Sequence, residues 1–284
     1  MPKTELASGL NFHYEQLGSG PDITLIHGLG GNLATWHFGI VPKLWDRYRC
    51  LTYDLRGHGY SDPAPSGYDW TEQARDLVQL LDALEIESTD VVGHSFGADI
   101  ALAFAYLYPE RVKHAVLIEA LVPALIPSPM RAMRTQRIWA AGLMEKAGIP
   151  IPKSRRLDTA YMLREARKYH NKWGPMKGMP ASWKTDSMID LFESTTIIDD
   201  LLKTGELTKD KLSQIKAPVH LIYDADSSQW MRSFKGLQKL LPNVTATLMH
   251  SGTEEFSHFL PLETPGIVVN EILVGIGERE PAPA

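Results

Sequence analysis

The chain of 284 residues contains a single cysteine, Cys50, and no run of 18 uncharged apolar residues. One cysteine cannot form a disulfide within the chain, so the fold must depend on a packed core. The first residues lack the apolar segment of a signal peptide, and no apolar run is long enough to cross a bilayer. These absences predict a cytoplasmic protein without a membrane span.

Motifs for metals and phosphates are also missing. The chain has no His-Glu-x-x-His pair, no Gly-x-Gly-x-x-Gly spacing and no Gly-Lys-Ser/Thr ending. A net charge of −5 and a pI near 6.1 give no general excess of positive charge for nucleic acid. We therefore expect no metal, no organic cofactor and no nucleic-acid partner, but a small-molecule substrate. The oligomeric state stays open.

Short apolar runs alternate with helical patterns along most of the chain, and the hydrophobic fraction of 44% can fill a large core. This alternation predicts an α/β fold with a doubly wound, mostly parallel sheet. Buried strands are expected at 23–26, 51–53, 90–92, 115–118, 219–223 and 245–249, helices at 77–83, 98–105, 231–241 and 264–274, and a hairpin at 4–16.

The middle of the chain differs from the rest. Residues 122–213 are rich in Met, Trp, Arg and Lys, and repeated prolines divide the segment into short helical pieces. We interpret this segment as a helical lid inserted into a core formed by residues 1–121 and 214–277. Residues 278–284 are expected to form a flexible tail.

The pentapeptide Gly93-His94-Ser95-Phe96-Gly97 carries the main chemical signal. A β-branched run precedes it and a helical pattern follows it, so Ser95 is expected at the apex of a sharp strand-to-helix turn. Glycines two residues to either side leave room for the strand and the helix to approach each other. This context predicts that Ser95 is a nucleophile.

A serine nucleophile needs a base within hydrogen-bond reach. His258 lies between the last predicted strand and the closing helix, and in a parallel sheet such loops converge on one crevice. We therefore favour His258 as the base, with His250 as a second choice. The loop His27-Gly28-Leu29-Gly30-Gly31 follows another strand, so the backbone N–H groups of Leu29 and Phe96 are the expected oxyanion hole.

Together these motifs resemble those of the α/β-hydrolase superfamily, in particular its lid-bearing serine hydrolases, from about Leu10 to Val274. The resemblance implies an α/β-hydrolase fold, a Ser–acid–His triad in that chain order, and a lid that shapes the substrate pocket. It also includes Asp54-Leu55-Arg56-Gly57-His58-Gly59-Tyr60-Ser61-Asp62, a loop that is usually structural in the family.

The acid of the triad departs from the family pattern. Most members end the strand after the lid in a Gly-x-x-Asp turn, whereas here Ser227 occupies the expected aspartate position and Asp226 lies one residue earlier. Glu119 ends the predicted strand at 115–118, and haloalkane dehalogenases and zearalenone-lactone hydrolases resemble this placement. We favour Glu119, with Asp226 as the alternative acid and Asp224 after it.

The substrate is less defined by the sequence. The candidate substrate-binding residues are Trp36, His94, Trp139 and Trp183, and Met-rich lid segments could add an apolar wall. The predicted activity is cleavage of a carboxylic ester, lactone or thioester of a largely apolar small molecule through an acyl-enzyme. Carbon–carbon bond hydrolysis, cofactor-free perhydrolysis and a non-catalytic ligand-binding role remain alternatives.

Overall fold

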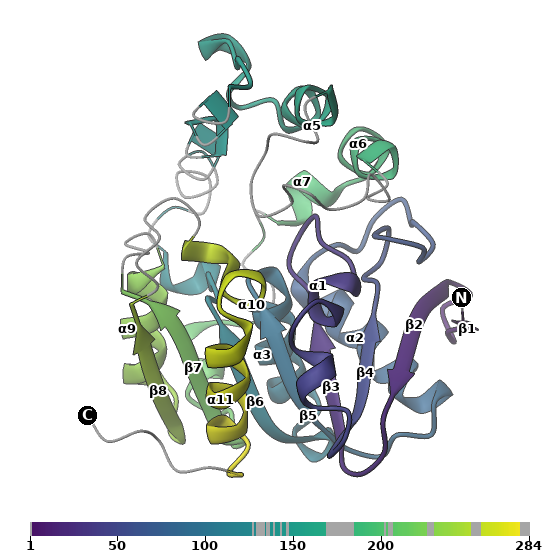
Figure 1. Cartoon of the computed structure of the whole chain (residues 1–284), viewed down its shortest axis with the longest axis vertical. Helices are drawn as coiled ribbons and strands as arrows, with labels where there is room; N and C mark the ends of the chain where they lie inside the picture. The colour runs from purple at the N-terminus through teal and green to yellow at the C-terminus, as the bar shows by residue number, and fades with distance from the viewer. Residues whose placement is uncertain are drawn as a thin grey trace.

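The computed structural model of the chain (Figure 1) has an α/β core with further helices above it. It describes residues 2–126, 128, 134, 137–138, 140–142, 144–145, 148–168, 185–201, 203, 207–225, 230–250 and 257–278. Within these residues, no helix is long and apolar enough to cross a membrane.

A central sheet of eight strands has the order β1-β2-β4-β3-β5-β6-β7-β8. Only β2 runs against the other strands, since it pairs in antiparallel fashion with both β1 and β4. All the other neighbours are parallel. The strands are β1 (Lys3–Glu5), β2 (Asn11–Leu17), β3 (Asp22–Ile26), β4 (Arg49–Tyr53), β5 (Thr89–His94), β6 (Val112–Ile118), β7 (Val219–Asp224) and β8 (Val244–Met249). The predicted strands, the hairpin and the α/β fold class are confirmed.

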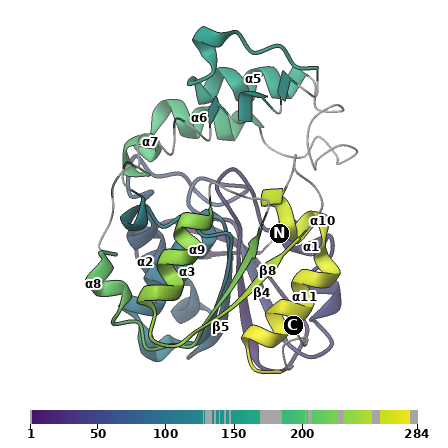
Figure 2. The ribbon, with the colours of Figure 1, turned by 90° about the vertical axis from the view of Figure 1, so that its left-hand side faces the viewer.

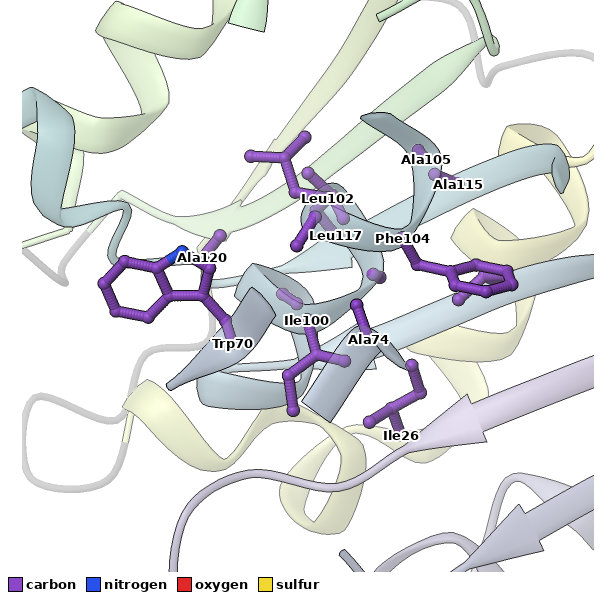
Figure 3. Close-up of a cluster of buried hydrophobic side chains, with 14 of the residues drawn as sticks. Ile26, Trp70, Ala74, Ile100, Leu102, Phe104, Ala105, Ala115, Leu117 and Ala120 are labelled. Carbon is purple, nitrogen blue, oxygen red and sulfur yellow. The ribbon is translucent and has the colours of Figure 1, made fainter. Parts of the chain in front are cut away.

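Side chains alternate between the two faces of the sheet, and each face has its own core. Helices α2 (Trp70–Ala83), α3 (Phe96–Leu107) and α9 (Met231–Leu240) cover one face, where Ile26, Leu117 and Leu102 pack in the larger cluster (Figure 3). Helices α1 (Ala34–His37) and α11 (Pro265–Gly275) cover the opposite face (Figure 2). This two-sided covering buries the parallel strands completely in the middle of the sheet.

The remaining described α-helices come from the segment predicted as a lid and from the loop before α11. Helices α5 (Thr159–Lys168), α6 (Thr185–Ser194) and α7 (Ile197–Asp200) lie beyond the sheet, at the top of Figures 1 and 2. Helix α8 (Lys209–Leu212) lies near α9, and α10 (Leu260–Glu263) precedes α11. The boundaries that we predicted for the lid and the core stay a prediction.

Asp200, at the end of α7, joins the upper helices to the core. Its Oδ2 accepts hydrogen bonds from the backbone N–H groups of Gly67 (3.1 Å) and Tyr68 (3.0 Å). Burial alone would raise the pKa of Asp200, but these bonds and those from Lys203 and Thr196 lower the pKa to about 2. The charged carboxylate therefore anchors this end of the segment to the loop before α2.

Candidate active site

Ser95 stands between β5 and α3 in a strained conformation, with φ 54° and ψ −120°. Positive φ is uncommon for a residue with a side chain, and it persists only where the surroundings enforce it. Here the Ser95 N–H donates to the carbonyl of Ile118 on the neighbouring strand β6 at 2.8 Å. The expected sharp turn is present, and Ser95 lies at its apex.

The glycines on either side of Ser95 are required by close backbone contacts. A Cβ atom on Gly93 would lie 2.2 Å from the carbonyl oxygen of Gly97, and one on Gly97 would lie 2.2 Å from the carbonyl oxygen of Ile26. Contacts this short would force the strand and the helix apart. The sequence therefore uses glycine here to bring β5, β3 and α3 together beneath Ser95.

The structure brings Ser95, His258 and Glu119 into one hydrogen-bonded chain. His258 Nε2 lies 2.8 Å from Ser95 Oγ, and His258 Nδ1 lies 2.7 Å from Glu119 Oε2. Glu119 is fully buried, and its second oxygen, Oε1, accepts the backbone N–H of Asp224 at 2.9 Å. In this arrangement the Ser95 hydroxyl can donate to Nε2 while Nδ1–H donates to the carboxylate, as proton transfer from a serine requires.

The three candidate acids have different places. Glu119 contacts the imidazole, and its backbone, like that of Ser95, has a positive φ of 53°. Asp224 contributes its backbone N–H to the carboxylate of Glu119. Asp226 lies outside the described residues. Within the part of the chain that the structure describes, the sequence's first choice is the one in contact with His258.

His258 is held as a neutral ring in an aromatic setting. Burial lowers the pKa of His258 to about 3, well below the usual value for histidine. The indole of Trp230 stacks on the imidazole, with ring centroids 4.2 Å apart and planes inclined by 27°. A neutral imidazole can accept a proton, and an aromatic face stabilises the cation that results.

His94 does not line the cavity described below, which corrects our expectation of a substrate contact. Its Nε2 donates to the backbone carbonyl of His258 at 2.7 Å, and the two rings lie 5.0 Å apart. Burial, followed by the neighbouring His258, lowers the pKa of His94 to about 3. His94 points from the strand end into the loop that carries His258, so its neutral ring holds that loop instead of meeting a ligand.

The candidate oxyanion loop is supported by two buried imidazoles. Gly30 N–H donates to His58 Nε2 at 3.2 Å, and the N–H of Leu55 donates to His27 Nε2 at 3.0 Å. Phe96 is the first residue of α3, where backbone N–H groups have no partner within the helix and where the helix dipole favours negative charge. Leu29 and Phe96 both border the cavity beside Ser95.

Asp54 confirms the structural interpretation of the loop 54–62. Its Oδ2 lies 2.7 Å from His13 Nδ1 and accepts the N–H of Tyr60, while Oδ1 accepts the N–H of Leu33. His58 likewise donates through Nδ1 to the carbonyl of Arg56 at 2.9 Å. The side chains of Asp54 and His58 therefore form hydrogen bonds that stabilise neighbouring loops. Neither residue lines the cavity.

A cavity of about 290 Å³ opens above Ser95, between the carboxyl ends of the strands and the upper helices. Its wall is mainly apolar, with a few polar groups. The lining residues are Leu29, Trp70, Ser95, Phe96, Asp99, Leu121, Pro123, Ile126, Arg137, Ala140, Thr159, Met162, Phe192, Ile198, Leu201, Trp230 and His258. Such a space suits a small, largely apolar ligand.

Comparison with known proteins assigns the family. The sequence profile of the alpha/beta hydrolase fold matches residues 22–175, more than half of the chain. The chain belongs to the alpha/beta hydrolase family. Family membership gives the fold, while the reaction that the protein catalyses is a separate question.

Individual relatives of this alpha/beta hydrolase match over shorter stretches. It is 43% identical over 103 residues to an uncharacterised protein of Mycobacterium bovis, covering 36% of this chain and 30% of that protein. It is 40% identical over 119 residues to 2-hydroxymuconate semialdehyde hydrolase of Pseudomonas sp. (strain CF600), covering 40% and 41%. These matches span less than half of each curated relative.

Solved structures resemble this chain over nearly its whole length. Est816, described as an N-acyl homoserine lactone degrading enzyme, has a TM-score of 0.67 at 24% identity and covers 95% of this chain and 98% of its own. The enol-lactonase of Burkholderia xenovorans LB400 has a TM-score of 0.66 at 21% identity, with 96% and 98% covered. At these identities the likeness is one of fold.

Trp36 is not part of the cavity wall, contrary to our expectation. It is fully buried in the cluster beneath α11, on the face of the sheet opposite α3. The chain after the oxyanion loop turns onto that face, so Trp36 serves packing. His250, the second choice for the base, is exposed and does not line the cavity. Trp139 and Trp183 lie outside the described residues.

Several wall residues were not singled out from the sequence. Trp230 and Trp70 are 2% exposed and border the cavity from the loop after β7 and the start of α2. Asp99 lies one helical turn after Ser95, which is a signal that the sequence did offer. The tryptophans offered no such signal, because only the tertiary fold brings those two loops to one opening.

Proposed function

We propose that this alpha/beta hydrolase cleaves a carboxylic ester, lactone or thioester of a small, largely apolar molecule through an acyl-enzyme on Ser95. The observation that carries the proposal is the continuous chain from Ser95 Oγ through His258 to the buried carboxylate of Glu119, with contacts of 2.8 and 2.7 Å. Ser95 and His258 border a largely apolar cavity.

The geometry supports a two-step acyl transfer. Ser95 Oγ attacks the carbonyl carbon while His258 Nε2 takes its proton, and Glu119 stabilises the imidazolium that forms. The oxygen that becomes negative is bound by the N–H groups of Leu29 and Phe96, and His258 returns the proton to the leaving oxygen or sulfur. A water molecule, activated by His258, then attacks the acyl carbon and releases the acid and free Ser95.

The alternative of an aspartate nucleophile, which dehalogenation and epoxide opening use, is disfavoured because a serine occupies the apex of the turn. A second candidate is hydrolysis of a carbon–carbon bond in a diketone-like substrate. The match to 2-hydroxymuconate semialdehyde hydrolase favours it, and the same three side chains could support attack on a ketone carbonyl.

Labelling with a fluorophosphonate tests the proposal directly. Folded wild-type protein should give one adduct, which peptide mass spectrometry locates on Ser95, and it should turn over p-nitrophenyl esters of short acyl chains. Ser95→Ala should lose both properties, whereas Ser8→Ala, at an exposed serine in the hairpin turn, should keep both. Absence of any adduct on folded wild-type protein would favour a ligand-binding role.

Product analysis separates the two enzyme candidates. An ester hydrolase should convert p-nitrophenyl esters or lactones to the acid and alcohol and leave a vinylogous 1,5-diketone unchanged. Turnover of the diketone to an acid and a ketone, with ester turnover at least tenfold slower, would favour the carbon–carbon bond hydrolase. Labelling of Ser95 is expected in both cases, so the product decides.

A further inference from the structure

Side chains from other elements form hydrogen bonds with the backbone of the turn that follows β6. It begins at Glu119, with φ 53°, and ends at Val122, with φ 28°, so both ends are strained. The carbonyl of Ala120 accepts the hydroxyl of Tyr223 at 2.7 Å, and the carbonyl of Leu121 accepts the hydroxyl of Ser233 at 2.5 Å. A strained turn needs such partners to persist.

Asp99 supplies the other half of this arrangement. Its Oδ1 accepts the backbone N–H of Val122 at 3.1 Å, and the N–H of Leu121 also bonds to the carboxylate. Asp99 therefore binds two of the N–H groups of the turn, while Tyr223 and Ser233 bind two of its carbonyls. We call these three side chains the turn clamp. All three are buried, with exposed fractions of 5%, 0% and 0%.

The turn clamp connects three elements of the fold to the turn that begins at Glu119, the residue in contact with His258. Tyr223 comes from β7, Ser233 from α9 and Asp99 from α3, the helix whose N-terminus carries Ser95. Asp99 follows Ser95 by one helical turn, so its bonds fix the turn after Glu119 relative to the helix of the nucleophile. Misplacement of a catalytic group by about 1 Å can reduce a rate by about 10²-fold.

Burying a carboxylate at position 99 costs desolvation free energy, so we expect the side chain to have a specific role. Burial raises the pKa of Asp99 to about 7, although its two backbone hydrogen bonds oppose the shift. An apolar residue would avoid the desolvation cost, but it would leave two buried N–H groups without an acceptor. Asp99 also borders the cavity beside Ser95, where such groups are concentrated in enzymes.

We propose that the turn clamp, with Asp99 at its centre, is a positioning device that holds Glu119 in reach of His258. Asp99 acts through Glu119 and does not itself touch the reacting atoms. This inference rests on the proposed function, since it concerns the efficiency with which Glu119 and His258 activate Ser95.

A double-mutant cycle on fluorophosphonate labelling tests the inference. The second-order labelling rate of Ser95 is measured for wild type, Asp99→Asn, Glu119→Gln and the double variant, each normalised to its folded fraction. Asp99→Asn should lower the rate roughly 10- to 100-fold in the wild-type background and no more than about 2-fold when Glu119 is already Gln. Ser233→Ala should show the same non-additivity with a smaller loss.

Asp90→Asn is the matched control. Asp90 is 6% exposed and pairs with His114 Nδ1 at 2.8 Å, but it lies at the opposite end of β5 from Ser95. Its variant should label at the wild-type rate per folded molecule. If Asp99→Asn does not fold, the Ser233→Ala cycle carries the test, because it removes a different bond of the same turn.

The outcomes separate this inference from the function on which it rests. Loss of rate that vanishes in the Glu119→Gln background supports the clamp. A wild-type rate in Asp99→Asn and Ser233→Ala, an equal loss in both backgrounds, or an equal loss in Asp90→Asn overturns it while the proposed function stands. Wild-type protein that is folded but not labelled overturns the proposed function, and the inference with it.

Discussion

Ser95 and Glu119 are neighbours on adjacent parallel strands, each one residue beyond a paired position, since His94 of β5 is in register with Ile118 of β6. Both have a positive φ, 54° and 53°, at the point where their strand ends. His258 reaches both side chains from a loop 139 residues after Glu119. The strand register therefore places two of the three groups, and the third is supplied by the loop before α10.

Replacing Glu119 by Gln should reduce kcat by roughly 10³- to 10⁴-fold with little change in KM. The amide cannot stabilise an imidazolium, and it can present its NH₂ to His258 Nδ1 and so favour the wrong tautomer. Steady-state turnover of a p-nitrophenyl ester measures the effect. Asp226→Asn is the comparison and should stay near the wild-type rate; a collapse in Asp226→Asn with near-full activity in Glu119→Gln would reverse the assignment.

Changing Trp230 should affect the rate through His258. The stacked indole stabilises the imidazolium by a cation–π interaction worth about 0.5–2 kcal/mol, so Trp230→Leu should lower kcat by roughly 2- to 30-fold. Trp230→Phe keeps an aromatic face and should fall in between. Trp70→Phe alters the same cavity away from the imidazole, so its effect should appear mainly in KM. Equal kcat losses in Trp70→Phe and Trp230→Phe would argue against the stacking role.

Much of the fold could be predicted because the residue patterns of its strands and helices are local in the sequence. The β-branched runs, the helical spacings and the glycines around Ser95 each depend on residues close in sequence. The same holds for His258, whose place before the closing helix follows from element order. The choice between Glu119 and Asp226 could not be made in this way, because it depends on which strand lies beside β5 and in which register.

The positions of Trp36, Trp230 and Asp99 could not be predicted, because they depend on how distant segments pack in the tertiary structure. We wrongly expected Trp36 at the cavity because it follows the oxyanion loop closely in the sequence. That closeness does not say which face of the sheet the chain then covers, and Trp36 packs on the face covered by α11. Trp230 follows β7 in the loop where the family usually carries its acid, yet only the packed structure stacks it on His258. The role of Asp99 also required the structure, since its partners lie 22 and 23 residues away.

The pH dependence of kcat/KM should show an acid limb below pH 6.5. Burial lowers the pKa of His258 to about 3, so the ring remains neutral and able to accept a proton in mildly acidic solution. Asp99, with a pKa of about 7, titrates above this limb, so profiles of wild type and Asp99→Asn are compared. A limb near pH 7 that disappears in Asp99→Asn belongs to Asp99, and the lower limb belongs to His258.

The stability of the fold sets the lowest pH at which the kcat/KM profile can be measured. His58, His94 and His258 all have folded pKa values of about 3, whereas unfolded histidine takes up a proton near pH 6.5. Below pH 6.5 these three histidines therefore bind more protons in the unfolded chain than in the folded one, and together they outweigh Asp99, whose raised pKa acts in the opposite direction. The free energy of unfolding should fall as the pH is lowered toward 3. Circular dichroism at each pH identifies the range in which the rates refer to folded protein. An acid limb above pH 6.5 in Asp99→Asn would contradict the assignment to His258.

Gly97→Ala should disrupt the turn that presents Ser95. The added Cβ would lie 2.2 Å from the carbonyl oxygen of Ile26 and 2.6 Å from that of His27, and both belong to buried backbone that cannot move aside without opening β3 from α3. Gly266→Ala makes the same change in α11, where no atom lies within 4 Å of the new Cβ, and should be neutral or add about 0.5–1 kcal/mol of stability through helix propensity. Chemical denaturation and fluorophosphonate labelling measure both variants. A Gly97→Ala protein with wild-type stability and labelling rate would mean that the turn tolerates a side chain there, and that close packing of β3 against α3 is not what holds Ser95 in its strained conformation.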